Sequence, residues 1–214
     1  MTEAREEILA RIRGALADVP GTERPADVPV AREYRPSGAL AGDALIERLA
    51  DRLREYDAEV RHAEPDGVGA AVAAACAETG VRHVVVPPAL PAAWRPDGVE
   101  VLEDGGLSAP RLDTIDGAVT GCAAAIAETG TIVLDGRGSS GRRIITLVPD
   151  HHICVVRRDQ VVELVPEAIE ALAPAVRGAR APVTLVSGPS ASSDIELSRV
   201  EGVHGPRHLV VILA

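Results

Sequence analysis

Apolar residues recur at four-residue intervals in three stretches of the first half of the chain, which predicts three amphipathic helices. The spaced residues are Ile8, Ile12 and Leu16 in the first, Leu45, Leu49 and Leu53 in the second, and Val68, Val72 and Cys76 in the third. The first helix is expected over residues 3–17. Gly80 is expected to end the third helix, because glycine readily adopts the left-handed conformation of a helix C-terminus.

Short runs of β-branched and apolar residues predict the strands. The runs are 58–62, 81–87, 99–102, 131–134, 144–148, 152–156, 161–165, 183–186 and 209–213. The early runs alternate with helices, which favours a mostly parallel sheet, whereas the three consecutive runs after residue 143 predict a meander or hairpin beside it. Pro166 is expected to open a helix that extends to Val176, and the last two runs to close the sheet. The pattern therefore predicts an α/β fold, an open, mostly parallel sheet with helices on both faces and an inserted β-hairpin.

The periodic pattern is interrupted between Val19 and Pro36, where prolines and charged residues dominate. Such a composition is typical of an extended linker. We therefore predict two parts, an N-terminal helix with a proline-rich linker over residues 1–37 and a main domain over residues 38–214. The first helix either stands apart from the main domain or folds back onto its core, and the sequence favours neither arrangement.

Composition and charge exclude several classes of function. The 214 residues carry a net charge of −10, and every basic side chain is arginine. An acidic chain without lysine argues against nucleic-acid or anionic membrane binding, lysine Schiff-base chemistry and a P-loop. The charged first residues and the lack of a long apolar run predict neither a signal peptide nor a membrane span, so a cytoplasmic location is expected.

The three cysteines, Cys76, Cys122 and Cys154, are far apart in the sequence. Iron–sulfur and zinc sites require closely spaced thiolates, so we expect no metal site and no cofactor in this chain. Each cysteine is instead predicted to be a small core residue.

Four blocks in the second half of the chain carry a family resemblance. They are Val119–Thr131 (VTGCAAAIAETGT), Pro149–Ile153 (PDHHI) with Gln160–Val162 (QVV), Ser187–Glu196 (SGPSASSDIE) and Gly202–Pro206 (GVHGP). In order and spacing they resemble the signature of the lactate-utilisation protein C family, whose members contain a LUD domain. The blocks extend over about half of the chain, and residues 38–214 are accordingly expected to be the LUD domain.

The resemblance implies a fold of the sugar-phosphate isomerase and CoA-transferase group (NagB/RpiA/CoA-transferase-like), with formyltetrahydrofolate cyclo-ligase as a relative. It also implies a role in oxidising L-lactate to pyruvate beside two partner proteins that hold the iron–sulfur clusters. This chain would be the cluster-free component, an accessory subunit of an L-lactate dehydrogenase complex, and its own catalysis is left open. The alternatives are a stand-alone enzyme of the CoA-transferase or cyclo-ligase kind, or a ligand-sensing module, for a small carboxylate or nucleotide. The ligand, the electron acceptor and the oligomeric state are not predicted.

Glu128 and His204 are the candidate catalytic residues. In the related transferases and isomerases a carboxylate acts as nucleophile or base, and the resemblance gives that role to Glu128. The alternative is structural, because Glu78 stands in the same Ala-Glu-Thr-Gly context before a strand. His204 lies between two glycines and can titrate near neutral pH. We expect Glu128 and His204 to lie within about 12 Å of each other across one ligand pocket.

Candidate ligand-binding residues surround these two in the sequence. They are Thr129, Gly130, Thr131, Ser187, Gly188, Pro189, Asp194 and Gly205. The Ser187–Glu196 segment is expected to follow a strand and to open a short helix whose backbone N–H groups could bind an anion. Ser193 and Glu196 also form a capping-box pattern, which needs no ligand.

Two further polar features each allow a functional or a structural interpretation. The loop Gly138–Arg143 contains two arginines and is either a lid that holds a carboxylate or a solvated hairpin tip. His152, at the beginning of a predicted strand, is favoured as an edge histidine with satisfied hydrogen bonds.

Overall fold

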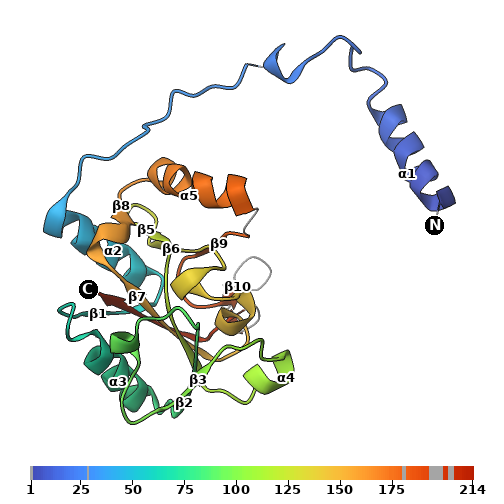
Figure 1. Cartoon of the computed structure of the whole chain (residues 1–214). Coiled ribbons are helices and arrows are strands. Elements are labelled where there is room, and N and C mark those ends of the chain that lie inside the picture. The colour runs from blue at the N-terminus through green and yellow to red at the C-terminus, as the bar shows by residue number, and fades with distance from the viewer. Residues whose placement is uncertain (1, 28, 180–181, 193–199, 202–204) are drawn as a thin grey trace. The chain divides into compact units, whose positions relative to one another are not determined.

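The computed structural model describes residues 2–27, 29–179, 182–192, 200–201 and 205–214, and it divides into two compact units, 1–34 and 35–214. The first unit contains α1 (Thr2–Ala15), the helix expected over residues 3–17, and the short 3-10 helix η1 (Pro25–Asp27) (Figure 1). Ile8 and Ile12, the apolar stripe of α1, are exposed. The domain boundary expected after residue 37 stays a prediction.

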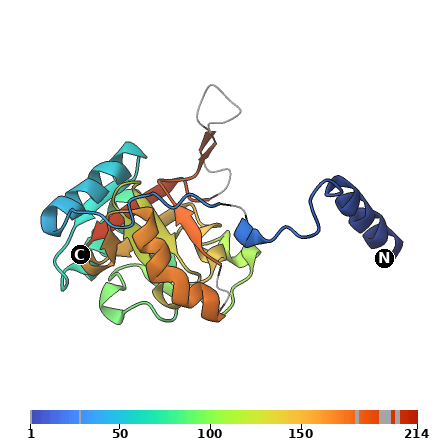
Figure 2. The same ribbon diagram turned by 90° about the horizontal axis from the view of Figure 1, so that it is seen from above.

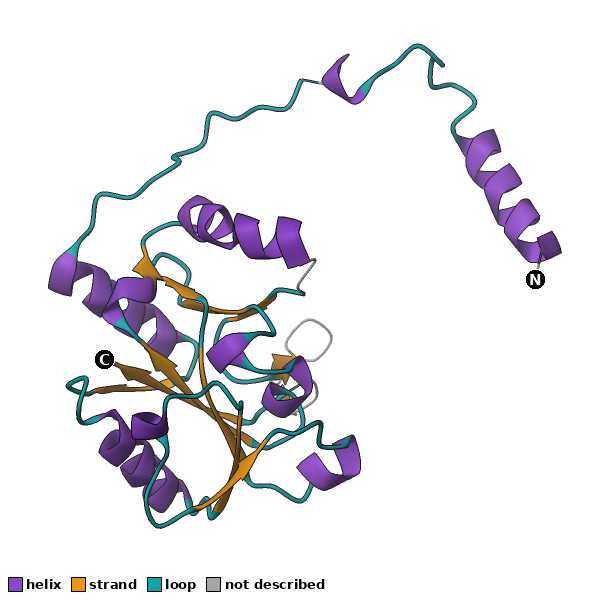
Figure 3. Cartoon of the chain, in the orientation of Figure 1, coloured by secondary structure: helices purple, strands orange, loops and turns teal. Residues whose placement is uncertain are grey.

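The second unit consists of helices around two main sheets. Its helices are α2 (Gly42–Glu55), α3 (Val68–Thr79), α4 (Ala109–Leu112) and α5 (Val165–Ala179), with 3-10 helices η2 (Ala92–Trp94), η3 (Gly138–Ser140), η4 (Arg143–Thr146) and η5 (Arg158–Gln160). The larger sheet contains β1 (Glu59–His62), β2 (His83–Val86), β3 (Glu100–Glu103), β4 (Gly117–Gly121), β7 (His151–Val156) and β12 (His208–Leu213). The smaller sheet contains β5 (Ala124–Ile126), β6 (Thr131–Leu134), β8 (Val161–Val162) and β9 (Thr184–Val186), and β10 (Ala191–Ser192) pairs with β11 (Val200–Glu201) (Figure 3).

The larger sheet has the strand order β1-β12-β7-β4-β2-β3, and every neighbouring pair is parallel. Side chains alternate between its two faces along each strand. Cys154 and Val156 of β7 pack with α2 on one face, whereas Ile153 and Val155 pack with α3 on the other. Figure 1 shows α2 and α3 on opposite sides of the strands, so the expected α/β fold with helices on both faces is confirmed.

The smaller sheet, ordered β8-β5-β6-β9, forms a further layer. Ala125 and Ile132 pack into the same core as α2, whereas Ala124, Ile126 and Val133 pack against α5. Figure 2 shows α5 in orange beside this layer. Within it β5 and β6 pair antiparallel, but they are not the inserted hairpin that the sequence predicts, which was expected from the runs between residues 144 and 165.

Three local predictions were wrong. The run 144–148 is largely the 3-10 helix η4 rather than a strand, because a short apolar run has no period that separates the two. The predicted meander does not form, since β7 lies inside the larger sheet between β12 and β4, while β8 joins the smaller one. The run 183–186 does not close the larger sheet either, because β9 pairs antiparallel with β6.

Two further features concern the segment after Ser187 and the character of the helices. The segment after Ser187 enters β10 rather than a helix within its described part, and residues 193–199 lie outside the described residues. Over the ranges that the structure describes, no helix is long and apolar enough to cross a membrane.

Candidate functional site

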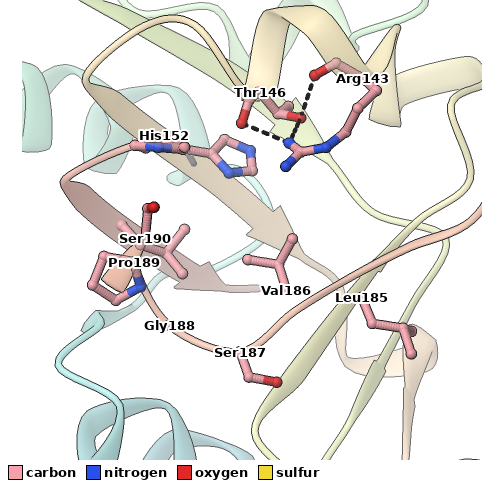
Figure 4. Close-up of a pocket in the computed structure, with 12 residues that line it drawn as sticks. Arg143, Thr146, His152, Leu185, Val186, Ser187, Gly188, Pro189 and Ser190 are labelled. Atoms are coloured by element: carbon pink, nitrogen blue, oxygen red, sulfur yellow. Dashed lines mark hydrogen bonds between the residues drawn. The ribbon is translucent and has the colours of Figure 1, made fainter. Parts of the chain in front are cut away.

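A cavity of about 220 Å³ lies where the turn after β9 approaches the beginnings of β7 and β12. It is lined by Arg143 and Thr146 of η4, His152 of β7, Leu185–Ser190, and Gly205 with Pro206 before β12 (Figure 4). The predicted ligand-binding residues Ser187, Gly188, Pro189 and Gly205 therefore share one cavity. It lies at the amino ends of the parallel strands, not at the carboxyl ends where open α/β sheets usually bind ligands.

Gly188 gives the cavity wall its tight turn. Its φ is +80°, and a Cβ at this position would lie 2.5 Å from the carbonyl oxygen of Tyr56, closer than nonbonded atoms approach. Only glycine meets both conditions, so the turn can pack directly on the end of α2. The backbone N–H of Ser190 then donates to the carbonyl of Pro206 over 2.8 Å, which joins the two segments that line this side.

A chain of hydroxyl groups connects the turn to the Ala-Glu-Thr-Gly segment. The Oγ1 of Thr131 lies 2.8 Å from the Oγ of Ser187 and 2.7 Å from the Oγ1 of Thr129. Figure 4 shows the Ser187 side chain turned away from the centre of the cavity. Gly130 packs the same segment on α2, since its φ is +59° and a Cβ would lie 2.8 Å from the backbone of Arg52. Thr129, Gly130 and Thr131 thus support the cavity from behind rather than line it.

Arg143 brings a positive charge into the cavity. Its Nη1 donates to the carbonyl and the hydroxyl of Thr146, over 2.8 and 2.9 Å. Within the described part of the chain, no carboxylate forms an ion pair with this guanidinium. Burial lowers its pKa from the ordinary value, but an arginine in a protein stays protonated.

The neighbouring Arg142 has a different environment. Its Nε and Nη2 donate to the two carboxylate oxygens of Asp104 over 2.7 and 2.6 Å. The Asp104 side chain is only 2% exposed, and the guanidinium beside it holds the pKa of that carboxyl below its usual range. Arg142 is therefore a structural residue, and of the two arginines in the loop only Arg143 is available to a ligand.

His152 stands beside Arg143 at the head of the cavity and is 2% exposed. Burial, with the positive charge of Arg143, lowers the pKa of the imidazole to about 4, so the ring is neutral near pH 7. Its Nε2 lies 2.8 Å from the hydroxyl of Thr120. The hydroxyl either donates to Nε2, which puts the ring hydrogen on Nδ1, or accepts from Nε2, which leaves Nδ1 an acceptor. In both tautomers Nδ1 has no partner among the described residues.

The sequence did not predict that His152 lines a cavity, and it favoured an edge histidine with satisfied hydrogen bonds. The structure places it on an inner strand instead. The sequence signal that was available is the pair of adjacent histidines in the second block. Its neighbour His151 stacks on His208 with ring centroids 4.5 Å apart, so the two histidines of the pair serve different environments.

Glu128 does not line the cavity. It is exposed, and its carboxylate pairs with Arg35 over 3.0 Å. The neighbouring Glu163 accepts the backbone N–H groups of Ala39 and Leu40, both over 2.6 Å, which lowers the pKa of its carboxyl. The catalytic role of Glu128 stays a prediction. His204 and Asp194 lie outside the described residues, and so does the expected approach of His204 to Glu128.

The cysteines lie in the core as expected. All three are free and buried, and burial raises the pKa of the Cys76 thiol to about 11, which disfavours the thiolate that metals bind. No cluster of three histidine, cysteine or acidic side chains suited to a metal ion occurs in the described ranges. That the chain works without a cofactor of its own stays a prediction.

Taken together, the cavity can bind a small anion. One guanidinium without an acidic partner among the described residues and one neutral imidazole face it, and apolar side chains such as Val186 complete its wall (Figure 4). Charge-assisted hydrogen bonds of this kind are among the stronger polar contacts in proteins.

Comparison with known proteins places the chain among close relatives. A family model described as "LUD domain" matches residues 102–214. "Lactate utilization protein C" of Deinococcus radiodurans is 45% identical over 99% of this chain and 95% of that protein, and its namesake in Halalkalibacterium halodurans is 26% identical over 96% and 95%. The crystal structure of a duf162 family protein from Deinococcus radiodurans superposes with a TM-score of 0.72 at 42% identity, over 82% of this chain and 99% of that one.

Proposed function

This chain belongs to the LUD domain family, and from that premise we propose that it is the cluster-free component of a system that oxidises L-lactate to pyruvate. The observation that carries the proposal is the 45% identity to a lactate utilization protein C along nearly the whole of both chains. The match covers 99% of this chain, so it includes the segments that line the cavity, and we expect a related ligand.

The cavity supports the proposal on chemical grounds. L-lactate and pyruvate are both small carboxylates, and the guanidinium of Arg143, which forms no ion pair with any described residue, suits a carboxylate group. The three buried cysteines are not arranged for an iron–sulfur cluster, so the electrons of lactate oxidation would pass to clusters in partner proteins. We therefore infer that the chain assembles with iron–sulfur proteins.

Deleting the gene in its host tests the pathway. The deletion strain should lose growth on L-lactate as the carbon source while it still grows on pyruvate, and a plasmid copy should restore growth. Growth on L-lactate at the wild-type rate after deletion would contradict the proposal.

Affinity purification from cells grown on L-lactate tests the assembly. The tagged chain should bring down proteins that contain iron and acid-labile sulfide, whereas the chain purified alone should contain neither. A preparation from lactate-grown cells without bound iron would argue against the partner proteins, even if the deletion removed growth.

The alternative of a ligand-sensing module gains support from the cavity itself, because its described lining offers a guanidinium to an anion and contains no carboxylate. It differs from the main proposal in one measurement, because a sensor would bind a carboxylate and yet be dispensable for lactate oxidation in cell extracts. A stand-alone transferase would need a carboxylate nucleophile in the cavity, and the described lining contains none.

A further inference from the structure

The two adjacent arginines offer a direct comparison. Arg142 holds the carboxylate of Asp104 through the edge of its guanidinium that carries Nε and Nη2. Arg143 uses Nη1 for Thr146, and its own Nε and Nη2 have no protein partner within the described ranges. The edge that binds a carboxylate in Arg142 is thus free in Arg143, and it faces the cavity (Figure 4).

A second hydrogen-bonding group lies beside this edge. The Nε2 of His152 is occupied by Thr120, so Nδ1 is the ring nitrogen that remains for a ligand in the cavity (Figure 4). Since the imidazole is neutral near pH 7, it offers one hydrogen bond without adding charge. A ligand that satisfies both residues needs a carboxylate for Arg143 and, next to it, an oxygen that hydrogen-bonds to Nδ1 of His152.

The size of the cavity limits the rest of the ligand. Its volume of about 220 Å³ is below the range of roughly 300–1,000 Å³ typical of sites for drug-sized ligands. The apolar side chains of Leu185 and Val186 provide contacts for a short alkyl group. A dinucleotide or a CoA thioester is larger than this volume and would have to extend out of the cavity.

We propose that the cavity binds a small 2-oxo or 2-hydroxy monocarboxylate, with its carboxylate on Nε and Nη2 of Arg143 and its C2 oxygen on Nδ1 of His152. The binding site follows from the arrangement of these two residues. Only the expectation that pyruvate and L-lactate are the physiological ligands rests on the proposed function.

Calorimetric titration of the purified full-length chain tests the ligand class with five probes. Pyruvate and L-lactate should bind, propionate should bind several-fold more weakly because it lacks the C2 oxygen, and methyl pyruvate at least tenfold more weakly because it lacks the charge. Inorganic phosphate distinguishes a general anion site, and phosphate binding as tight as that of pyruvate would overturn the carboxylate assignment. Equal affinity for pyruvate and methyl pyruvate would overturn the role of the guanidinium without any mutation.

Two variants test the residue assignment. Arg143→Gln should weaken pyruvate binding at least about tenfold, as expected for the loss of hydrogen bonds to a charged group. Arg158→Gln is the matched control, since it removes the same charge from an exposed ion pair with Asp43 outside the cavity. Its affinity for pyruvate should stay within twofold of the wild type, and Arg143→Lys should give an intermediate value because a lysine keeps the charge without the fork.

The titration also separates this inference from the proposed function, because it needs no partner protein and no lactate growth. No binding of either acid, or an Arg143→Gln variant that binds pyruvate like the wild type, would overturn the site while the pathway assignment stood. Tight pyruvate binding by a protein whose deletion leaves lactate growth intact would overturn the pathway assignment and leave the site in place.

Discussion

The hydroxyl oxygens of Thr131 and Ser187 lie 2.8 Å apart, and the hydrogen bond between them ties β6 to the turn after β9. Thr131 is 5% exposed, so its hydroxyl has little access to water. The two strands are antiparallel neighbours, with Ile132 opposite Val186. The bond therefore extends the pairing of the strands by one step and holds the turn that forms the cavity wall.

Removing either hydroxyl should destabilise the fold modestly. Thr131→Val and Ser187→Ala should each lower the free energy of unfolding by about 1 kcal/mol, the usual net contribution of one hydrogen bond. Urea unfolding of the two single variants and the double variant gives the coupling, which should be about 0.5–1 kcal/mol. Strictly additive effects would mean that the two groups do not interact.

His152 should make the stability of the protein depend on pH between about 6.5 and 4. Its folded pKa of about 4 lies below the unfolded value of 6.5, so the unfolded chain binds more protons in this window. Its contribution is complete above pH 6.5 and is lost as the pH falls toward 4, by roughly 3 kcal/mol in total. Urea unfolding at several pH values gives the free energy of unfolding as a function of pH for the wild type and for His152→Asn. The difference between the two pH dependences is the contribution of His152.

The titration of the imidazole itself provides the control. NMR signals of the His152 ring should not titrate above pH 5, whereas a histidine in an unfolded reference peptide titrates near pH 6.5. A ring of His152 that protonates near pH 6.5 would contradict both the effect of burial on its pKa and the neutral imidazole in the cavity.

Gly188→Ala should be strongly destabilising. The left-handed backbone and the close approach to Tyr56 together predict a loss of about 2–4 kcal/mol in the free energy of unfolding. Gly178→Ala is the matched control, because Gly178 lies in α5 with no heavy atom within 4 Å of the added methyl. That substitution should stabilise the protein by about 0.5–1 kcal/mol through helix propensity. Thermal unfolding would contradict the account if both variants moved in the same direction.

Glu128→Gln tests the catalytic role that the sequence predicts for this carboxylate. Its ion pair with Arg35 is exposed, so the substitution should change the free energy of unfolding by less than about 1 kcal/mol. If the carboxylate is catalytic, the variant loses growth on L-lactate although it folds. Glu78→Gln is the control, since Glu78 stands in the same Ala-Glu-Thr-Gly context and pairs with Arg61 on the surface. Growth of both variants at the wild-type rate would leave Glu128 without a catalytic role.

Much of the fold could be predicted from local pattern. The spacing of Leu49 and Leu53 gives α2, and Gly80 ends α3 with a φ of +73°, as expected for a C-terminal glycine. The strands β4 and β5 were not identified because glycine and alanine dominate them, and these residues have low strand propensity. Their small size is required by neighbours far away in the sequence, since a Cβ at Gly121 would lie 2.5 Å from the hydroxyl of Ser139.

Part of the site could also be predicted from local pattern. The glycine turn at Gly188 follows from a strand-terminal Ser-Gly-Pro, which local sequence reveals. The difference between Arg142 and Arg143 cannot be predicted from local sequence, because it depends on Asp104, 38 residues away in the chain. The hydrogen bond between His152 and Thr120 joins the neighbouring parallel strands β7 and β4, so it likewise depends on their register.

The position of β12 sets the order in which the protein can fold during synthesis. Among the described strands, β1 hydrogen-bonds to β12 alone, with Glu59 opposite Val210. At ribosomal rates the roughly 150 residues between these partners take about 8–30 s to be made, and for that time β1 has no strand to pair with. The nascent α2–β1–α3 segment therefore leaves the exit tunnel with an unpaired strand, and this strand stays open to non-native pairing until β12 inserts between β1 and β7.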